Sequence, residues 1–348
     1  MEDNITDIDY DSVQAHEEFN GSHNNSGVGQ LYLCATPIGN LEDITFRVLR
    51  ILKEVDIIAA EDTRNSIKLL NHFEINTPMT SYHEYNKYDK AKVLVEKMLK
   101  GMSVAVITDA GTPGISDPGE ELVRQALASG IKVSSVPGAA ACITALTMSG
   151  QATRRFAFEA FLPADKNERK DILKELEDET RTMIIYEAPH RLLKTLKELS
   201  EVLGGSRAVT ICKELTKRYE NSMVTTLAEA CSYYENNQPR GEYVLVIAGK
   251  DRNELKEEAQ AQWLTMSEQE HVDMYIAQGL DKKEAMKAAA RDRGVSKIRW
   301  SVGYGFCGRM RKMSPPVISC INCATYCVFP NTFPLMTTVL FSSSRLML

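Results

Sequence analysis

From Leu31 onward, short apolar runs alternate with longer segments in which apolar and polar residues follow a helical period. The runs that predict strands cover residues 31–35, 55–60, 103–109 and 131–136. The segments that predict helices cover residues 45–54, 65–72, 90–99, 118–129 and 139–148. Strands that alternate with helices in this way form a largely parallel sheet covered on both faces. We therefore expect an N-terminal α/β domain over residues 31–150.

The apolar pattern lapses around residues 150–155 and then resumes. The next predicted strands cover residues 156–162, 182–187, 207–214 and 243–249, and the predicted helices cover residues 167–178 and 189–203. A second α/β domain is therefore expected over residues 151–250. The fold class is α/β with two such domains, and a functional site is expected in the cleft between them because ligands bind beyond the carboxyl ends of parallel strands.

Both ends of the chain depart from this pattern. Residues 1–30 contain seven acidic and no basic residues, and a segment of this composition cannot bury enough apolar surface to fold, so we expect a disordered leader. Residues 251–297 contain two short amphipathic segments broken at Gly279. They predict a small helical module that resembles part of a helix-turn-helix.

The last 51 residues, 298–348, have neither acidic residues nor hydrophobic periodicity. The third helix of the module should start near Ser296, and we hypothesise that the irregular tail after it is a frameshifted or misread end of the gene. Cys320, Cys323 and Cys327 are spaced as in some metal sites, but no histidine or acidic residue lies near them. We therefore expect no metal.

Composition narrows the class of protein further. The N-terminus lacks the basic and apolar regions of a signal peptide, and no apolar run before residue 298 is long enough to span a membrane. Cysteines scattered singly through apolar segments are typical of buried thiols in a reducing cytoplasm. The net charge is −6, and residues 31–297 contain 36 basic and 40 acidic residues. Binding to a nucleic acid would therefore depend on a local basic patch.

The most informative motif, DAGTPGISDPG, spans Asp109–Gly119 directly after a predicted strand. Gly111 and Gly114 allow a ligand to approach the backbone closely. Asp117 is expected to cap a helix that begins at Pro118.

This loop lacks both the GK[ST] ending of a triphosphate-binding loop and the GxGxxG pattern. Its backbone amides, Asp109 and Thr112 are suited to a ligand that carries amine, carboxylate and hydroxyl groups. The alternative is an ordinary connection between a strand and a helix.

Two further turns follow predicted strands. TPIGN, residues 36–40, is a tight glycine turn, and VPGAAA, residues 136–141, begins a helix with very small side chains. Small residues at a helix start allow close approach of a flat ring or of another helix, so simple helix packing is the alternative explanation for each motif.

Charged residues also gather at strand ends in both predicted domains. The three motifs are AAEDTR at 59–64, EAPHR at 187–191 and KELTKR at 213–218. Five basic residues in them would form a cationic wall of the cleft able to contact phosphates: Arg64, Arg191, Lys213, Lys217 and Arg218. Surface salt bridges are the alternative for each of them.

Taken together, the motifs TPIGNLEDIT, AAEDTR, DAGTPGISDPG, VPGAAA, FLP, YEAPHR and KELTK resemble, in order and spacing, the small-subunit (16S) rRNA 2′-O-ribose cytidine methyltransferase I family. That family belongs to the tetrapyrrole methylase-like superfamily. The resemblance covers about residues 31–250 and, weakly, the helical segment up to 297. The sequence departs from the family at Ala160, where glycine is usual, and after Glu220, where an Arg-Gly pair is missing.

The resemblance implies an enzyme that uses S-adenosyl-L-methionine to methylate the ribose 2′-hydroxyl of a cytidine in the decoding region of small-subunit rRNA. It implies a homodimer, with the rRNA or the ribosomal subunit as partner. By the same resemblance the cofactor would contact Pro37, Gly39, Asp109, Ala110, Gly111, Thr112, Ile115, Ala140, Ala141 and Tyr186.

A base that accepts the proton of the 2′-hydroxyl would assist methyl transfer. Its candidates are Glu61, Asp62, Glu187 and Glu214, of which we favour Asp62. Lys213 is an alternative aid, because its charge would lower the pKa of the hydroxyl. Arg64, Arg191, Lys217 and Arg218 are the expected RNA contacts.

Two other functions are weighed against this one. A tetrapyrrole C-methyltransferase would have the same fold, but EDTR, YEAPHR and KELTK fit the rRNA family. A non-catalytic nucleic-acid-binding regulator would use the C-terminal helices, but the module lacks a clear third helix.

Overall fold

The computed structural model describes residues 27–295. Residues 1–26 of the predicted leader, the third helix of the C-terminal module, the tail and its three cysteines lie outside the described residues. Gln30, which was predicted to end the leader, is instead the first residue of strand β1 (Gln30–Cys34). The chain divides into two compact units after Ala259, and the first unit holds both α/β sheets.

The first sheet, predicted to be largely parallel, is parallel throughout, with the strand order β3-β2-β4-β1-β5. Its strands are β1 (Gln30–Cys34), β2 (Ile57–Ala60), β3 (Met79–Ser81), β4 (Val104–Ile107) and β5 (Lys132–Val136). The central strand β4 is fully buried because helices cover both faces of the sheet.

The helices of this domain are α1 (Phe46–Glu54), α2 (Thr63–His72), α3 (Lys87–Leu99), α4 (Gly119–Ala128) and α5 (Ala141–Met148), with a short 3-10 turn at Leu41–Asp43. Val48 and Leu70 from α1 and α2 belong to the hydrophobic cluster on one face of the sheet. Leu94 and Leu122 from α3 and α4 belong to the cluster on the other face. Each helix therefore buries a single apolar face, as its sequence pattern predicts.

The second sheet is mixed, with the order β6-β7-β10-β8-β9. Its strands are β6 (Phe156–Phe161), β7 (Thr182–Glu187), β8 (Ala208–Lys213), β9 (Asn221–Thr226) and β10 (Tyr243–Ile247). Of the four ladders in this sheet, the one between β6 and β7 is parallel and the other three are antiparallel, so β10 runs antiparallel to both of its neighbours. The start of β10 therefore lies beside the ends of β7 and β8, which determines where the functional site forms.

Three helices cover one face of the second sheet: α6 (Lys166–Leu176), α7 (Leu192–Leu203) and α8 (Leu227–Asn236). The opposite face packs against α5, whose Cys142, Ala145 and Leu146 lie in one cluster with residues of β7, β8 and β10. The domain boundary expected at residue 150 assigns α5 to the first domain. In the structure α5 packs against the second sheet. Strands β3 and β9 and helix α8 were not predicted. The sequence of β9, NSMVTT, has no apolar alternation.

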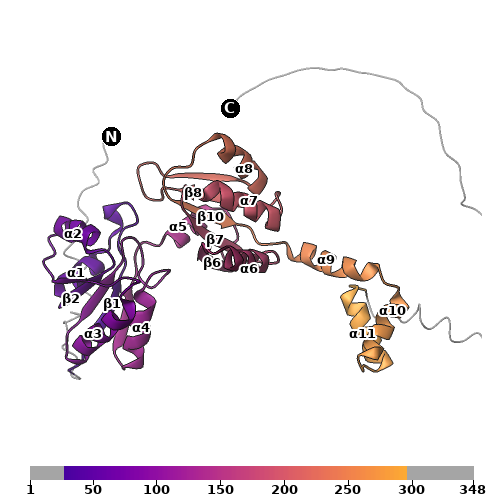
Figure 1. Ribbon diagram of the computed structural model, residues 1–348, viewed down its shortest axis with the longest axis horizontal. Coiled ribbons are helices and arrows are strands. Elements are labelled where there is room, and N and C mark those ends of the chain that lie inside the picture. Colours follow the sequence, from indigo (N-terminus) through magenta and orange to yellow (C-terminus); the bar gives the residue numbers. More distant parts are fainter. Residues whose placement is uncertain (1–26, 296–348) are drawn as a thin grey trace, which may run out of the picture. The chain divides into compact units, whose positions relative to one another are not determined.

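The last elements are α9 (Arg252–Leu264), which crosses the division between the two units, and the helix pair α10 (Glu268–Ala277) and α11 (Lys282–Asp292) (Figure 1). Val272 packs with Ala285 and Ala289 in a small core. Ser267 and Asp281 cap the two helices with their side chains, which confirms the predicted helices of this segment. No helix among the described residues is long and apolar enough to cross a membrane.

Ala160 occupies a strained position in β6. The ladder to β7 shifts between Phe158 and Ala160, and Ala160 has a φ of 51° in the left-handed region. A Cβ atom is unfavourable in this conformation by about 1–2 kcal/mol, and glycine is not. The bulge gives a physical reason for the glycine that is usual at this position in the family that the sequence resembles.

We predict that Ala160→Gly raises the free energy of unfolding by about 1 kcal/mol, which is roughly 2–4 °C in Tm for a domain of this size. Differential scanning calorimetry measures the change. The matched control is Ala157→Gly in the same strand, where pairing with Met183 is regular and glycine should lower the Tm. Equal destabilisation by both variants would contradict the strain at Ala160.

Candidate functional site

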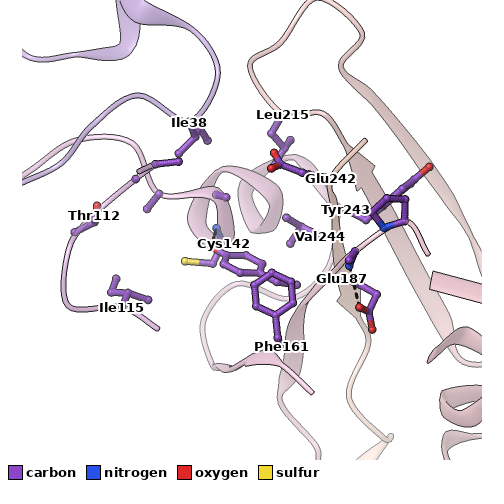
Figure 2. A pocket seen from close by; sticks show the side chains of 17 residues that line it. Ile38, Thr112, Ile115, Cys142, Phe161, Glu187, Leu215, Glu242, Tyr243 and Val244 are labelled. Atoms are coloured by element: carbon purple, nitrogen blue, oxygen red, sulfur yellow. Dashed lines mark hydrogen bonds between the residues drawn. The ribbon is translucent and has the colours of Figure 1, made fainter. Parts of the chain in front are cut away.

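A largely apolar cavity of about 470 Å³ lies between the two α/β domains and is lined by residues of both. We call it the apolar cavity. Figure 2 shows Ile38, Thr112 and Ile115 from two loops of the first domain on one side, and Leu215 and Val244 from the second domain on the other. Its size and lining are those of a site for a small organic molecule.

Seven of the ten predicted cofactor contacts line this cavity: Ala110, Gly111, Thr112, Ile115, Ala140, Ala141 and Tyr186. Pro37, Gly39 and Asp109 line a second, neighbouring cavity instead. The structure therefore brings together residues from motifs that lie up to 149 positions apart in the chain.

The loop after β4 is held by backbone hydrogen bonds to the turn after β1. Thr36 and Gly111 exchange N–H···O bonds of 2.9 and 3.1 Å, and Gly111 has a φ of 89°. The hydroxyl of Thr112 donates to the carbonyl of Ala139 at 2.9 Å and links this loop to the start of α5. The hydroxyl of Thr112 is therefore engaged in fixing the cavity wall.

The second half of the same loop is organised by Asp117. Its carboxylate accepts hydrogen bonds from the backbone amides of Gly114, Ile115 and Gly119. The prediction that Pro118 is the first helical residue was wrong by one position: α4 begins at Gly119, because Pro118 is its N-cap. Asp117 fixes the loop and the helix start, and three amides occupy its oxygens.

Tyr186 forms a wall of the apolar cavity at the end of β7. Its hydroxyl accepts a hydrogen bond of 2.9 Å from the backbone amide of Cys142, and Phe158 and Phe161 pack edge-on against its ring. Burial raises the pKa of Tyr186 above its ordinary value. Its phenol is therefore neutral at physiological pH and presents an uncharged aromatic surface.

A second cavity of about 480 Å³ adjoins the first and shares Ile38, Ala110 and Glu242 with it. We call it the polar cavity, because its lining includes Asn65, Ser66, Lys68, His72, Asp109 and Lys217. Ser66 is 4 % exposed, and its hydroxyl has no hydrogen-bond partner within residues 27–295. A buried hydroxyl without a partner is costly, and this one belongs to a residue that borders the polar cavity.

Glu61 and Asp62 follow β2, and the structure gives them opposite environments. The carboxylate of Asp62 accepts from the side chain of Arg64 at 2.7 Å and from its backbone amide at 2.8 Å, which lowers the pKa of Asp62 to about 2. Burial, together with the neighbouring acids, raises the pKa of Glu61. Neither residue lines either cavity.

Lys213 and Glu214 lie at the end of β8, beside the start of β10. Glu214 accepts hydrogen bonds from the Nζ of Lys217 at 3.0 Å and from the amide of Glu242 at 2.9 Å. Although burial opposes it, these bonds lower the pKa of Glu214.

Lys217 also donates to the Oε2 of Glu242 at 2.6 Å. Its pKa is raised, because the two carboxylates outweigh the effect of burial. Gly39 packs so closely on this lysine that a Cβ atom at position 39 would collide with its Cγ. The predicted glycine turn is therefore required by the close approach of the two domains.

Of the five predicted basic residues, Lys217 lines the polar cavity, and the other four line neither of these two cavities. Arg64 is paired with Asp62 and its side chain is 88 % exposed. Arg191 donates to the carbonyl of Leu162 at 2.7 Å, and Arg218 is exposed beside the ring of Tyr219. Lys68 and Lys217 are the lysines and arginines that line the two cavities, so the cationic wall expected from the sequence is much smaller than predicted.

Glu187 is buried in a hydrogen-bonded network under the apolar cavity. One of its oxygens accepts from the amide of Ala188, drawn as a dashed line in Figure 2. The other accepts from the hydroxyl of Thr195. Arg169 donates to the same Thr195 at 2.7 Å and to Glu198 at 2.7 Å. With both oxygens accepting hydrogen bonds and its side chain fully buried, Glu187 positions the turn after β7 and is a weaker candidate for the base.

The structure adds functional candidates that the sequence reasoning missed, namely Asn65, Ser66 and Glu242. Glu242 precedes a strand that is buried throughout its length, and this charge next to an apolar run was a signal in the sequence. It was overlooked because only the carboxyl ends of strands were considered, whereas β10 is antiparallel to its neighbours. No cluster of His, Cys, Asp or Glu among residues 27–295 has the arrangement of a metal site.

Comparison with known proteins agrees with this architecture. Residues 30–231 match the family of Tetrapyrrole (Corrin/Porphyrin) Methylases. Among solved structures, a diphthine synthase aligns with a TM-score of 0.52 over 63 % of this chain and 90 % of that protein. At 12 % identity, this likeness concerns the fold alone.

Two curated relatives are much more similar in sequence. The ribosomal RNA small subunit methyltransferase I of Halalkalibacterium halodurans is 49 % identical over 269 residues, which are 77 % of this chain and 92 % of the relative. The protein of the same name from Bacillus subtilis is 46 % identical over 279 residues, 80 % of this chain and 94 % of the relative. The chain belongs to the ribosomal RNA small subunit methyltransferase I family of the tetrapyrrole methylases.

Proposed function

We propose that this protein transfers the methyl group of S-adenosyl-L-methionine to the ribose 2′-hydroxyl of a cytidine in the decoding region of small-subunit rRNA. The observation that carries the proposal is the pair of adjoining cavities, one apolar and one polar, in a chain of this family. We further propose that it acts in the cytoplasm as a homodimer. Relatives named for rRNA methylation favour this substrate over a tetrapyrrole, and a cavity lined by both α/β domains favours an enzyme over a binding regulator.

The apolar cavity fits the cofactor in size and chemistry. Ala140 and Ala141 leave room for a flat ring, and Ile38, Leu215 and Val244 provide apolar contacts around it. The volume of about 470 Å³ lies within the range of sites for ligands of this size. The bound cofactor supplies a methyl group already activated by its positively charged sulfur, so the protein's main contribution is to position the acceptor.

The polar cavity is the proposed site of the target nucleotide. It opens beside the apolar cavity through the shared residues Ile38, Ala110 and Glu242. Asp109 accepts a hydrogen bond of 3.2 Å from the side-chain amide of Asn65, which holds both side chains at the cavity wall. Ser66 and Lys68 add groups able to bond a ribose hydroxyl and a phosphate.

Glu242 is the proposed general base. It lies where the two cavities meet, and its side chain is 78 % exposed. Lys217 holds one of its oxygens, while Glu214 fixes its backbone. Asp62, which the sequence analysis favoured, is a weaker candidate, because a carboxylate with a pKa of about 2 has little affinity for a proton.

The first test is methylation by the purified protein. With deuterium-labelled S-adenosyl-L-methionine and small-subunit rRNA, nuclease digestion and mass spectrometry should find the label in 2′-O-methylcytidine. A parallel reaction with a tetrapyrrole acceptor should yield no labelled product. Label on a base carbon of the RNA, or in the tetrapyrrole only, would refute the proposed acceptor.

A larger side chain in the apolar cavity should exclude the cofactor. We expect Ala141→Leu to weaken binding of S-adenosyl-L-methionine at least tenfold by isothermal calorimetry, because the added carbons occupy the cavity. Ala164→Leu, at an exposed position outside both cavities, is the control and should bind normally. Equal affinity for all three proteins would mean that the cofactor binds elsewhere.

Removal of the proposed base should affect turnover more than binding. Glu242→Gln should lower kcat by about 10²-fold, within the usual range for a general base, with cofactor affinity unchanged. Asp62→Asn is the matched comparison and should keep a kcat close to that of the unaltered protein. The opposite pattern, with loss at Asp62 and full turnover at Glu242, would return the role to Asp62.

A further inference from the structure

A groove of about 500 Å³ lies at the other end of the second sheet from the two cavities. It is formed where β6 and β7 begin and β10 ends, and its lining includes Arg154, Arg155, Thr182 and Arg252. Three of its lining residues are arginines and none is acidic. We call it the arginine groove.

The three arginines are exposed and carry charge that the surrounding structure does not neutralise. Within residues 27–295, no carboxylate lies in ion-pair distance of Arg154, Arg155 or Arg252. The neighbouring Arg181 is different, because it is paired with Glu179.

Other charges near the groove are already committed to protein contacts. Lys250 is paired with Asp178 and Glu258. Asp251, which precedes the third arginine of the groove, caps α9 by accepting from the amide of Asn253 at 2.6 Å. Two negative charges remain uncompensated among these groups, that of Asp251 and that of the second carboxylate on Lys250, and the three arginines of the lining outnumber them.

The backbone that bears the first two arginines is tied to the sheet. The hydroxyl of Thr182, which is 3 % exposed, donates to the carbonyl of Ala152 at 2.7 Å. The amide of the same residue donates to the carbonyl of Arg155 at 3.3 Å. Guanidinium groups on a fixed backbone lose less conformational freedom when they bind an anion.

We propose that the arginine groove binds the phosphodiester backbone of the substrate RNA. Arginine matches phosphate oxygens with two parallel hydrogen bonds, and the lining offers no carboxylate that would repel them. This inference rests on the proposed function for the RNA itself. Because residues 31–297 are nearly neutral overall, binding of RNA requires a local basic patch, and the arginine groove is such a patch.

The distance between groove and cavities decides which RNA can use both. Thr182 at the start of β7 lines the groove, and Glu187 at its end lines the apolar cavity. A strand of this length spans roughly 17 Å. A mononucleotide cannot reach both sites, so the groove should contribute only to the binding of longer RNA.

The test uses the full chain with Arg154→Gln, Arg155→Gln and Arg252→Gln combined. Filter binding to a small-subunit rRNA fragment over a series of KCl concentrations should show affinity at least tenfold weaker at low salt. The slope of log K against log salt should fall by about two to three, since each phosphate contact adds about 0.7–0.9. Cofactor affinity, and turnover of a short oligonucleotide that carries the target cytidine, should be unchanged.

The matched control removes three positive charges that are paired in the first domain, with Arg50→Gln, Lys92→Gln and Arg124→Gln. An equal loss of affinity in this control would show a general charge effect and overturn the proposal. An unchanged salt slope with naked RNA would also overturn the proposal. If the triple variant then lost binding only to assembled ribosomal subunits, the groove would contact an acidic protein and not the RNA. Failure of the unaltered protein to methylate RNA would refute the proposed function, while an arginine-dependent salt slope would still support the groove.

Discussion

The packing of α5 against the second sheet is the constraint on which the functional site depends. This helix follows the first sheet in the chain, yet Cys142 and Leu146 are buried against Ile184 and Val246 of the second sheet. Two hydrogen bonds reinforce the contact: the Cys142 amide donates to the Tyr186 hydroxyl, and Thr210 donates to the carbonyl of Ser149 at 2.8 Å. Because the start of α5 is a wall of the apolar cavity, the packing that joins the domains also fixes the distance across the cavity.

The parallel domain could be predicted from its sequence, and the antiparallel part of the second domain only in outline. The strand over residues 104–107 is recognisable as a short apolar run, because helices cover it on both faces. Strand β9 has no such pattern, since it is an edge strand whose side chains are largely exposed. Strand direction was not encoded in any local pattern, and Glu242 was missed for that reason.

The roles of the acidic residues likewise depended on contacts that a sequence does not display. AAEDTR shows two neighbouring acids and an arginine, but only the structure shows that Arg64 folds back on Asp62 and lowers its pKa to about 2. Glu187 was a candidate for the base because it lies at the end of a strand. In the structure its oxygens accept hydrogen bonds from an amide and a hydroxyl. Glu242 lines both cavities, and Lys217 holds one of its carboxylate oxygens in place. An accessible carboxylate with a fixed position is suited to the proposed role of accepting a proton.

Charge distribution links these local findings to the substrate. Nearly equal numbers of acidic and basic residues between positions 31 and 297 give no broad attraction for a polyanion. At the cavities, carboxylates hold the Lys217 ammonium, which limits what it can give to a phosphate. Arg154, Arg155 and Arg252 of the arginine groove have no such partners among the described residues, unlike the neighbouring Arg181. A chain arranged in this way would separate recognition of the RNA backbone from the chemistry of the ribose, so that the groove governs affinity and its salt dependence while the cavities govern turnover.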